Sequence, residues 1–150
     1  MSTVINNYKI CEQIPQHLKQ EIKYFYVFND WDGHNILFVT FDDMVYGLGS
    51  NSEGRLGLGH NTLIDTPQRV PQLCHQNIHQ FFSGFDFVLA VNTDNNVIFS
   101  FGRLNWGQLG RDVDSGRNVY HKPDTILYFQ SNNLIVSQIS CGESHTIVLT

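Results

Sequence analysis

Short apolar runs separated by turns rich in Asp and Asn recur along most of the chain. The run at residues 36–39 and the run at residues 88–91 are each followed by such a turn and then by a second run rich in Val, Ile, Phe and Tyr. β-Branched and aromatic residues favour strands, and a short Asp/Asn turn between two strands favours an antiparallel hairpin. The pattern therefore predicts successive β-hairpins, with the apolar run at residues 146–149 in the last of them.

A glycine-rich motif follows each of the first two predicted hairpins. The motif at residues 49–59 recurs at residues 102–110, about 53 residues later. Because a recurring motif is usually a building unit, we interpret these glycines as structural residues that permit positive φ and close chain approach. The predicted repeat signature consists of Gly49, Gly54, Leu56, Gly57, Gly84, Gly102, Gly107, Leu109, Gly110, Gly142 and His145.

The length of the repeat indicates the fold class. About 53 residues exceeds the roughly 40–45 of a WD40 blade but suits a four-stranded propeller blade with longer loops. Helical solenoids fit less well, because the glycines would interrupt their helices. We predict an all-β fold, a partial β-propeller of about two to three blades that is not closed, because propellers close with about four to eight blades.

The repeats occupy residues 24–150, and they are preceded by an N-terminal segment, residues 1–23. The predicted copies lie near residues 24–49, 45–102 and 98–150. In the N-terminal segment, Pro15 begins a short amphipathic helix that we expect to cap the first blade or pack beside it. Because the last copy stops partway through a hairpin, we expect the chain to be a piece of a longer protein rather than a truncated product.

The glycine motifs resemble the repeat of a known family. Residues 49–59, residues 102–110 and the segment Cys141–Thr146 are similar to the repeat of the RCC1 family, the regulator-of-chromosome-condensation-like propellers. The resemblance covers roughly residues 24–150. In detail the chain is most similar to the RCC1-and-BTB-domain proteins, whose propeller starts with an aromatic stretch like residues 24–28.

The chain departs from the family pattern at three positions. Arg55 stands where the family usually has Gln, and Leu104 stands where Asn is usual. Phe87 in one copy, and Asn35 or His34 in the copy before it, occupy the place that His145 fills in the last copy. These departures weaken individual copies and leave the repeat recognisable.

The resemblance implies a protein-interaction scaffold. In RCC1-and-BTB-domain proteins the propeller would recruit a client protein while a BTB domain, absent from these residues, joins a cullin-based ubiquitin ligase. The alternative is guanine-nucleotide exchange on a Ran-type small GTPase, the activity for which the family is best known. The expected partner is therefore a protein, either a client or a small GTPase.

Composition narrows the partners and the compartment. The formal net charge is −5 and the pI is about 5.7, which argues against nucleic acid and anionic membranes as partners. No signal-peptide-like or membrane-length apolar run occurs, and no Asn-x-Ser/Thr sequon is present. The three cysteines are an odd number spaced far apart, so we expect reduced thiols and a cytoplasmic or nuclear protein.

Motifs of the common enzyme classes are absent from the sequence. The glycine motifs lack the Gly-Lys-Ser/Thr ending of a phosphate-binding loop, and no nucleophile elbow or His-Glu-x-x-His motif occurs. Cys74, His75 and His79 form the one cluster that resembles a metal site, but the two histidines would share a face only on a helix, and a loop leading into a strand is predicted there. We therefore predict no catalytic residues, no metal and no cofactor.

Two residues near the end of the chain invite a catalytic reading that we consider weaker than a structural one. His145 follows Gly142 and precedes an apolar run, so we expect a buried or half-buried imidazole that bonds a backbone group across blades. Cys141 aligns with Ser83 of the previous copy and is expected to be a small core residue. The acidic pair Asp42–Asp43 is assigned to turn formation, because Asp side chains bond their own backbone in turns and tolerate left-handed geometry.

Overall fold

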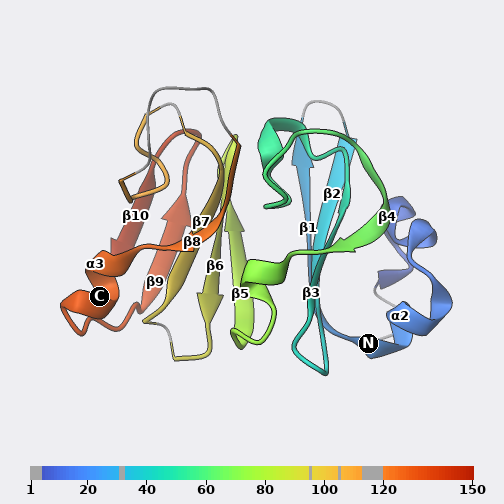
Figure 1. Ribbon diagram of the computed structural model, residues 1–150, viewed down its shortest axis with the longest axis horizontal. Coiled ribbons are helices and arrows are strands. Elements are labelled where there is room, and N and C mark those ends of the chain that lie inside the picture. The colour runs from blue at the N-terminus through green and yellow to red at the C-terminus, as the bar shows by residue number, and fades with distance from the viewer. Residues whose placement is uncertain (1–4, 31–32, 95, 105, 113–119) are drawn as a thin grey trace.

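Two four-stranded antiparallel sheets and a two-stranded hairpin lie side by side in the part of the chain that the structure describes (Figure 1). The computed structural model describes residues 5–30, 33–94, 96–104, 106–112 and 120–150. The sheets do not close into a ring. The predicted all-β fold, a partial propeller with a short N-terminal helix, is therefore confirmed.

Strands follow one another in space as they do along the chain. The first sheet consists of β1 (Ile22–Asp30), β2 (Gly33–Thr40), β3 (Val45–Gly49) and β4 (Ile64–Arg69). The second sheet consists of β5 (Ile78–Ser83), β6 (Phe87–Asn92), β7 (Ile98–Arg103) and β8 (Tyr120–Thr125). The third sheet is the hairpin of β9 (Gln138–Cys141) and β10 (Thr146–Leu149).

Short helices connect or flank these sheets. The 3-10 helices are η1 (Lys9–Gln13), η2 (Ser52–Gly54) and η3 (Pro71–Leu73), and the α-helices are α2 (Gln16–Glu21) and α3 (Leu127–Ser131). None of the helices in the described ranges is both long enough and apolar enough to cross a membrane.

The predicted hairpin turn at Asp42–Asp43 joins β2 to β3. Asp43 has φ +60, and the Thr40 hydroxyl donates a hydrogen bond to the Asp42 carboxylate, so this acidic pair serves the turn as predicted. The Asp43 carboxylate also accepts a hydrogen bond from the Asn77 backbone N–H at 2.9 Å, which ties the turn to the start of the second sheet. The corresponding predicted turn at residues 94–96 includes residue 95, which lies outside the described residues.

Apolar side chains fill the spaces between neighbouring sheets. Every residue of β6 is buried, because the first sheet covers one face of the second sheet and the third sheet covers the other. The cluster between the first and second sheets consists of Phe28, Leu37, Val39, Val45, Leu56, Ile64, Val70, Leu73, Ile78, Phe81, Val88, Ala90, Phe99 and Phe101. The cluster between the second and third sheets consists of Phe87, Leu89, Val91, Ile98, Leu109, Ile126, Val136 and Ile139.

The N-terminal segment covers the outer face of the first sheet (Figure 1). Its helix α2 follows Pro15, as predicted, but contributes only the half-buried Leu18 to the contact. The buried contact consists of Ile5, Ile10, Cys11, Ile14, Ile22, Ile36, Phe38 and Leu48. The larger share therefore comes from residues before Pro15, including η1, which the sequence analysis did not predict.

The repeat seen in the sequence is out of phase with the sheets. The predicted copy near residues 45–102 begins at β3 of the first sheet and ends in β7 of the second. This copy and the copy near residues 98–150 thus each carry the last two strands of one sheet and the first two or three strands of the next, whereas the copy near residues 24–49 lies within the first sheet. The glycine motifs at residues 49–59 and 102–110 each lie between the third and fourth strands of a sheet, β3 and β4 or β7 and β8.

Candidate functional site

The first glycine motif forms a loop that is organised around one buried asparagine. Asn51 has φ +54, and its side-chain amide donates to the carbonyls of His60 at 2.8 Å and Thr62 at 3.1 Å. Its side-chain oxygen accepts from the Leu56 N–H at 3.0 Å, and its own N–H donates to the Asn35 side chain at 2.8 Å. The Asn51 side chain thereby closes the loop on itself, and the Asn51 backbone N–H ties the loop to β2.

This loop reaches across to the second sheet. Leu56 is fully buried in the cluster between the two sheets, and Glu53 forms a 2.9 Å ion pair with Arg103 at the end of β7. Gly57 has φ +76, and a Cβ there would lie 2.9 Å from Pro123 and 3.0 Å from Phe101. The glycine therefore allows the loop to lie directly against β7 and β8.

The second glycine motif reaches a similar position with different polar contacts. Leu104 takes the place of Asn51 and packs its side chain against the cluster between the second and third sheets. The loop is held instead by buried Gln108, whose amide donates to the Asp86 carboxylate at 2.9 Å and accepts from the Trp106 N–H at 2.8 Å. Leu109 is fully buried, as Leu56 is. The loss of the usual asparagine is thus compensated within the same loop.

Arg55 is the buried charged residue that links the first two sheets. Its side chain is 2% exposed, and its guanidinium donates to the carbonyls of Asn29 at 2.9 Å and Gly84 at 3.2 Å. The guanidinium carbon lies 5.4 Å from the centre of the Phe28 ring. Because Asn29 belongs to β1 and Gly84 follows β5, Arg55 fixes the spacing between β1 and β5. In the second loop, Gln108 takes the place of Arg55.

We call β1, β5 and β9, the first strand of each sheet, the inner strands. Their ends meet at one surface, which we call the inner-strand rim. It contains a shallow cavity of about 490 Å³ lined by Asn29, Arg55, Ser83, Gly84, Phe85, Cys141, Gly142 and Glu143. The rim is cross-linked by a 3.1 Å hydrogen bond from the Phe85 N–H to the Glu143 carbonyl and by a 2.9 Å bond between the Tyr26 and Ser83 hydroxyls. Phe85 is 40% exposed there. The rim thus combines a fixed framework with an accessible aromatic ring.

His145 departs from the expectation for this residue. It was expected to be buried or half-buried and to bond a backbone group across blades, but its side chain is exposed. Its ring instead packs over Gly142, as the ring of Phe87 packs over Gly84, so the predicted equivalence of Phe87 and His145 holds. Phe87 is fully buried under the third sheet, whereas no described residues cover the matching face of that third sheet. This difference explains the exposure of His145.

The remaining signature glycines occupy three kinds of place. Gly49 and Gly102 end strands β3 and β7, where a Cβ would collide with the backbone of the neighbouring strand. Gly54 and Gly107 lie at the turns of the two loops, and Gly110 lies beside Ile126. The signature is therefore distributed over two loops and three hairpins and does not converge on one reactive centre.

The structure places Cys74 and His75 in a turn and His79 in β5. No group of three or more His, Cys, Asp or Glu side chains that could hold a metal occurs in the described ranges. Cys74 accepts a hydrogen bond from the Val45 N–H at 3.4 Å, His75 lies in a turn with φ +60, and His79 lies in β5, consistent with the predicted loop leading into a strand.

Burial makes two of the cysteines poor nucleophiles. Burial raises the pKa of the Cys141 thiol, and it also raises the pKa of the fully buried Cys11 thiol, an effect that the nearby Lys19 partly offsets. Since the thiolate is the reactive form, both thiols are expected to react slowly near neutral pH. Cys141, expected to be a small core residue, is half-buried and packs against the edge of the cluster between the second and third sheets.

Comparison with protein families gives a match over most of the chain. The model described as Regulator of chromosome condensation (RCC1) repeat matches residues 42–91 and residues 95–149. The first match runs from the turn before β3 to β6, and the second includes β7, β8, β9 and β10. The family repeat is therefore placed across the junction of two sheets, as the predicted copies near residues 45–102 and 98–150 are.

Curated relatives are similar to the chain over a small part of their own length. Mouse serine/threonine-protein kinase Nek9 (Mus musculus) is 37% identical over 102 residues, which is 68% of this chain and 10% of the relative. The rat protein named Probable E3 ubiquitin-protein ligase HERC4 (Rattus norvegicus) is 31% identical over 114 residues, which is 76% of this chain and 10% of the relative. The chain thus spans about a tenth of the length of these relatives.

Solved structures share the arrangement of sheets. Human WBSCR16 superposes with a TM-score of 0.68 at 27% identity, over 86% of this chain and 30% of that one. Yeast RCC1 (Prp20), solved bound to Kap60, superposes with a TM-score of 0.58 at 25% identity, over 77% of this chain and 25% of that one.

Proposed function

Because the chain belongs to the RCC1 repeat family, we propose that it is a protein-binding module that carries out no reaction of its own and that contacts its partner through the inner-strand rim. The observation that carries this proposal is the cavity of about 490 Å³ built from the ends of three sheets and held by Arg55. Rigid scaffolds with exposed loops are suited to binding. Yeast Prp20, a similar structure, is itself recognised by another protein, Kap60.

Phe85 and Glu143 are the rim residues proposed to contact the partner. Phe85 combines an exposed ring with a backbone N–H fixed to the Glu143 carbonyl, so little conformational entropy is lost when a partner covers it. Aromatic residues that are already held in place are common centres of binding energy in protein interfaces. The Glu143 side chain is exposed beside it and would select a partner with a basic group at this place.

The finer role that we propose is recruitment of a client to a ubiquitin ligase through a BTB domain outside these residues. Its support is the resemblance of the aromatic stretch at residues 24–28 and of the glycine motifs to RCC1-and-BTB-domain proteins. HERC4, a relative that is similar to this chain, is named as a probable ubiquitin-protein ligase. Guanine-nucleotide exchange on a Ran-type GTPase is the alternative.

A matched pair of double variants tests the rim. Phe85→Ser with Glu143→Arg should reduce recovery of the partners of the full-length gene product by about tenfold or more, the loss typical of a central aromatic. Leu63→Ser with Asp65→Arg makes the same chemical changes at exposed positions on and beside the outer strand β4, and should leave recovery unchanged. Quantitative mass spectrometry of the captured proteins provides the measurement. The proposal is contradicted if both double variants reduce partner recovery equally, or if neither reduces it.

The same captures separate the finer roles. Recovery of a cullin with the full-length product supports client recruitment, and its absence removes that role. For the alternative, release of fluorescent GDP from a Ran-type GTPase is followed with and without the chain. A release rate above the spontaneous rate would favour exchange over the proposed scaffold role.

A further inference from the structure

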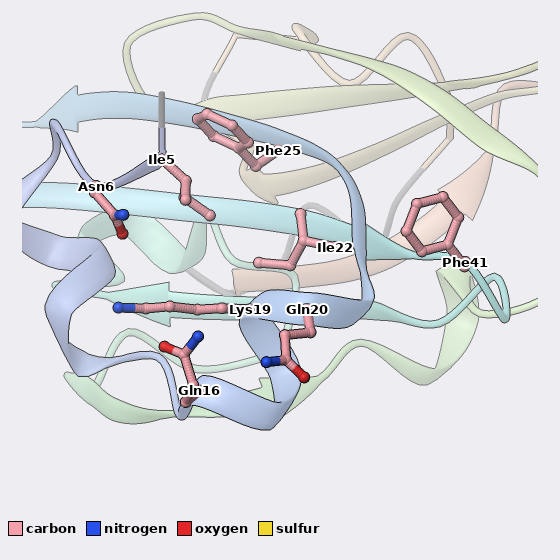
Figure 2. Close-up of a pocket in the computed structure, with 8 residues that line it drawn as sticks. All are labelled: Ile5, Asn6, Gln16, Lys19, Gln20, Ile22, Phe25 and Phe41. Atoms are coloured by element: carbon pink, nitrogen blue, oxygen red, sulfur yellow. The ribbon is translucent and has the colours of Figure 1, made fainter. Parts of the chain in front are cut away.

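A second pocket lies away from the rim, between the N-terminal segment and the first sheet (Figure 2). Its volume is about 320 Å³, and it is lined by Ile5, Asn6, Gln16, Lys19, Gln20, Ile22, Phe25 and Phe41. Figure 2 shows apolar side chains from the segment and the sheet on one side, and the polar side chains of α2 on the other. The pocket exists because the N-terminal segment packs against β1.

The apolar side of the pocket is held in place. Ile5 and Ile22 are buried, and Phe25 is half-buried against Tyr8, with 6.1 Å between the ring centres. Phe41 is 66% exposed at the edge of the pocket, and its backbone N–H donates to the Glu21 carbonyl at 2.9 Å. The adjacent Thr40 is fixed by hydrogen bonds to the Asp42–Asp43 turn, so the exposed ring of Phe41 sits on a well-defined backbone.

The polar side of the pocket offers amides and one positive charge. Gln16 and Gln20 each carry a donor and an acceptor, the combination that pairs with the N–H and C=O groups of an extended peptide. Lys19 is the one ionisable side chain among the lining residues, and it forms no ion pair within the described ranges. This ammonium beside apolar surface favours a carboxylate.

The pocket is not a feature of the repeat. Thr93 takes the place of Phe41 in the next hairpin, and the matching face of the second sheet is covered by the first sheet rather than by a helical segment. A ligand of this pocket would therefore recognise the first sheet and its N-terminal segment alone.

We propose that this pocket binds a short extended peptide of a partner protein, in which a large apolar side chain is followed by a carboxylate. A volume of about 320 Å³ is at the lower end of the range for ligand pockets, which is about 300–1,000 Å³, so it suits one anchoring side chain with its flanking peptide groups. The anchor packs between Phe41 and Ile22, the amides of α2 pair with the peptide backbone, and Lys19 meets the carboxylate. This inference rests on the proposed role in protein binding.

Defined peptides test the pocket directly. The ¹⁵N-labelled chain is titrated with acetyl-Gly-Phe-Glu-Gly-amide, and also with the same peptide carrying Gln in place of Glu or Ser in place of Phe. We expect amide shifts around Phe41 and α2 with the Phe-Glu peptide, about three- to fivefold weaker binding of the Phe-Gln peptide, and no saturable binding of the Ser-Glu peptide. Absence of shifts in this region at millimolar Phe-Glu peptide overturns the proposal.

Two variants assign the specificity to the named residues. Lys19→Gln should abolish the preference for Glu over Gln in the peptide, whereas Lys23→Gln removes an exposed lysine that does not line the pocket and should preserve it. Phe41→Ser should weaken both peptides, and Leu63→Ser should weaken neither. A loss of preference in Lys23→Gln as large as in Lys19→Gln overturns the assignment. The rim variants report on the proposed function separately, since neither rim residue lines this pocket.

Discussion

Two glycines of the repeat signature share a positive φ but differ in what surrounds them. Gly57 has φ +76 and lies against Pro123 and Phe101, whereas a Cβ at Gly107, with φ +78, would meet nothing within 4 Å. The pair therefore separates backbone strain from steric conflict. Left-handed backbone costs a residue with a side chain about 1–2 kcal/mol, and overpacking adds about 1–3 kcal/mol.

We predict that Gly107→Ala lowers the free energy of unfolding by about 1–2 kcal/mol and that Gly57→Ala lowers it by about 2–5 kcal/mol. Urea denaturation of the two variants beside the parent chain measures the difference. Equal shifts of the midpoint would mean that the contact of the first loop with β8 is not tight.

The sequence reveals the type of residue needed in the loops better than it reveals their contacts. The glycine spacing predicted a structural motif, and Gly54, Gly57 and Gly59 do have positive φ. The role of Arg55 could not be read in advance, because its two carbonyl partners come from different sheets. His145 was misjudged because exposure depends on what covers a face, and local sequence does not contain that information.

At the scale of the elements, the packing of the N-terminal segment on the first sheet can be followed through Cys11. That thiol is fully buried, and burial raises its pKa above the ordinary value of 9.0. The neutral thiol is favoured in the docked segment, so its stabilising effect is complete below about pH 9.0 and is lost as the pH rises through the raised pKa. Release of the segment would expose the thiol and return its pKa toward 9.0.

We predict that Ile14→Ser increases the rate at which iodoacetamide modifies Cys11 near pH 8 by about tenfold or more, because loss of a buried isoleucine costs about 2–5 kcal/mol. His17→Ser changes an exposed neighbour and should leave the rate unchanged. Peptide mass spectrometry resolves Cys11 from the other cysteines. A parent chain in which Cys11 already reacts as fast as in the Ile14→Ser variant would contradict the buried contact.

Elements with a strong local pattern were predicted, and elements defined by distant partners were not. The hairpins, the helix after Pro15 and the Asp42–Asp43 turn follow from alternation, proline geometry and turn chemistry. Helix α3 and η1 are too short to give a clear apolar period. The path of the glycine loops onto the next sheet is set by contacts about 50–70 residues away in sequence, as between Gly57 and Pro123, and local patterns do not report such contacts.

At the scale of the whole molecule, the third sheet has an apolar face that no described residues cover. Ile147 is 66% exposed and Leu149 is 59% exposed, whereas the equivalent Leu89 and Val91 of the second sheet are buried under the third. An apolar face beside the free edge of β10 favours association with another sheet.

We predict that the isolated 150-residue chain self-associates as its concentration rises. The double variant Ile147→Lys with Leu149→Lys should shift the chain to monomer, whereas Leu63→Lys, at a position that is 69% exposed elsewhere, should not. Light scattering coupled to gel filtration gives the mass of each species. A parent chain that stays monomeric at every concentration tested would count against the open array.

The buried contact between the N-terminal segment and the first sheet gives the array a direction. That face of the first sheet already has a neighbour in Ile10, Cys11 and Ile14, so a further sheet can pack on the third sheet without displacing the N-terminal segment, but it meets these residues at the first sheet. A ring that closes against the first sheet must therefore share this face with the N-terminal segment or displace the segment. We therefore expect self-association of the chain to use the face of the third sheet rather than that of the first.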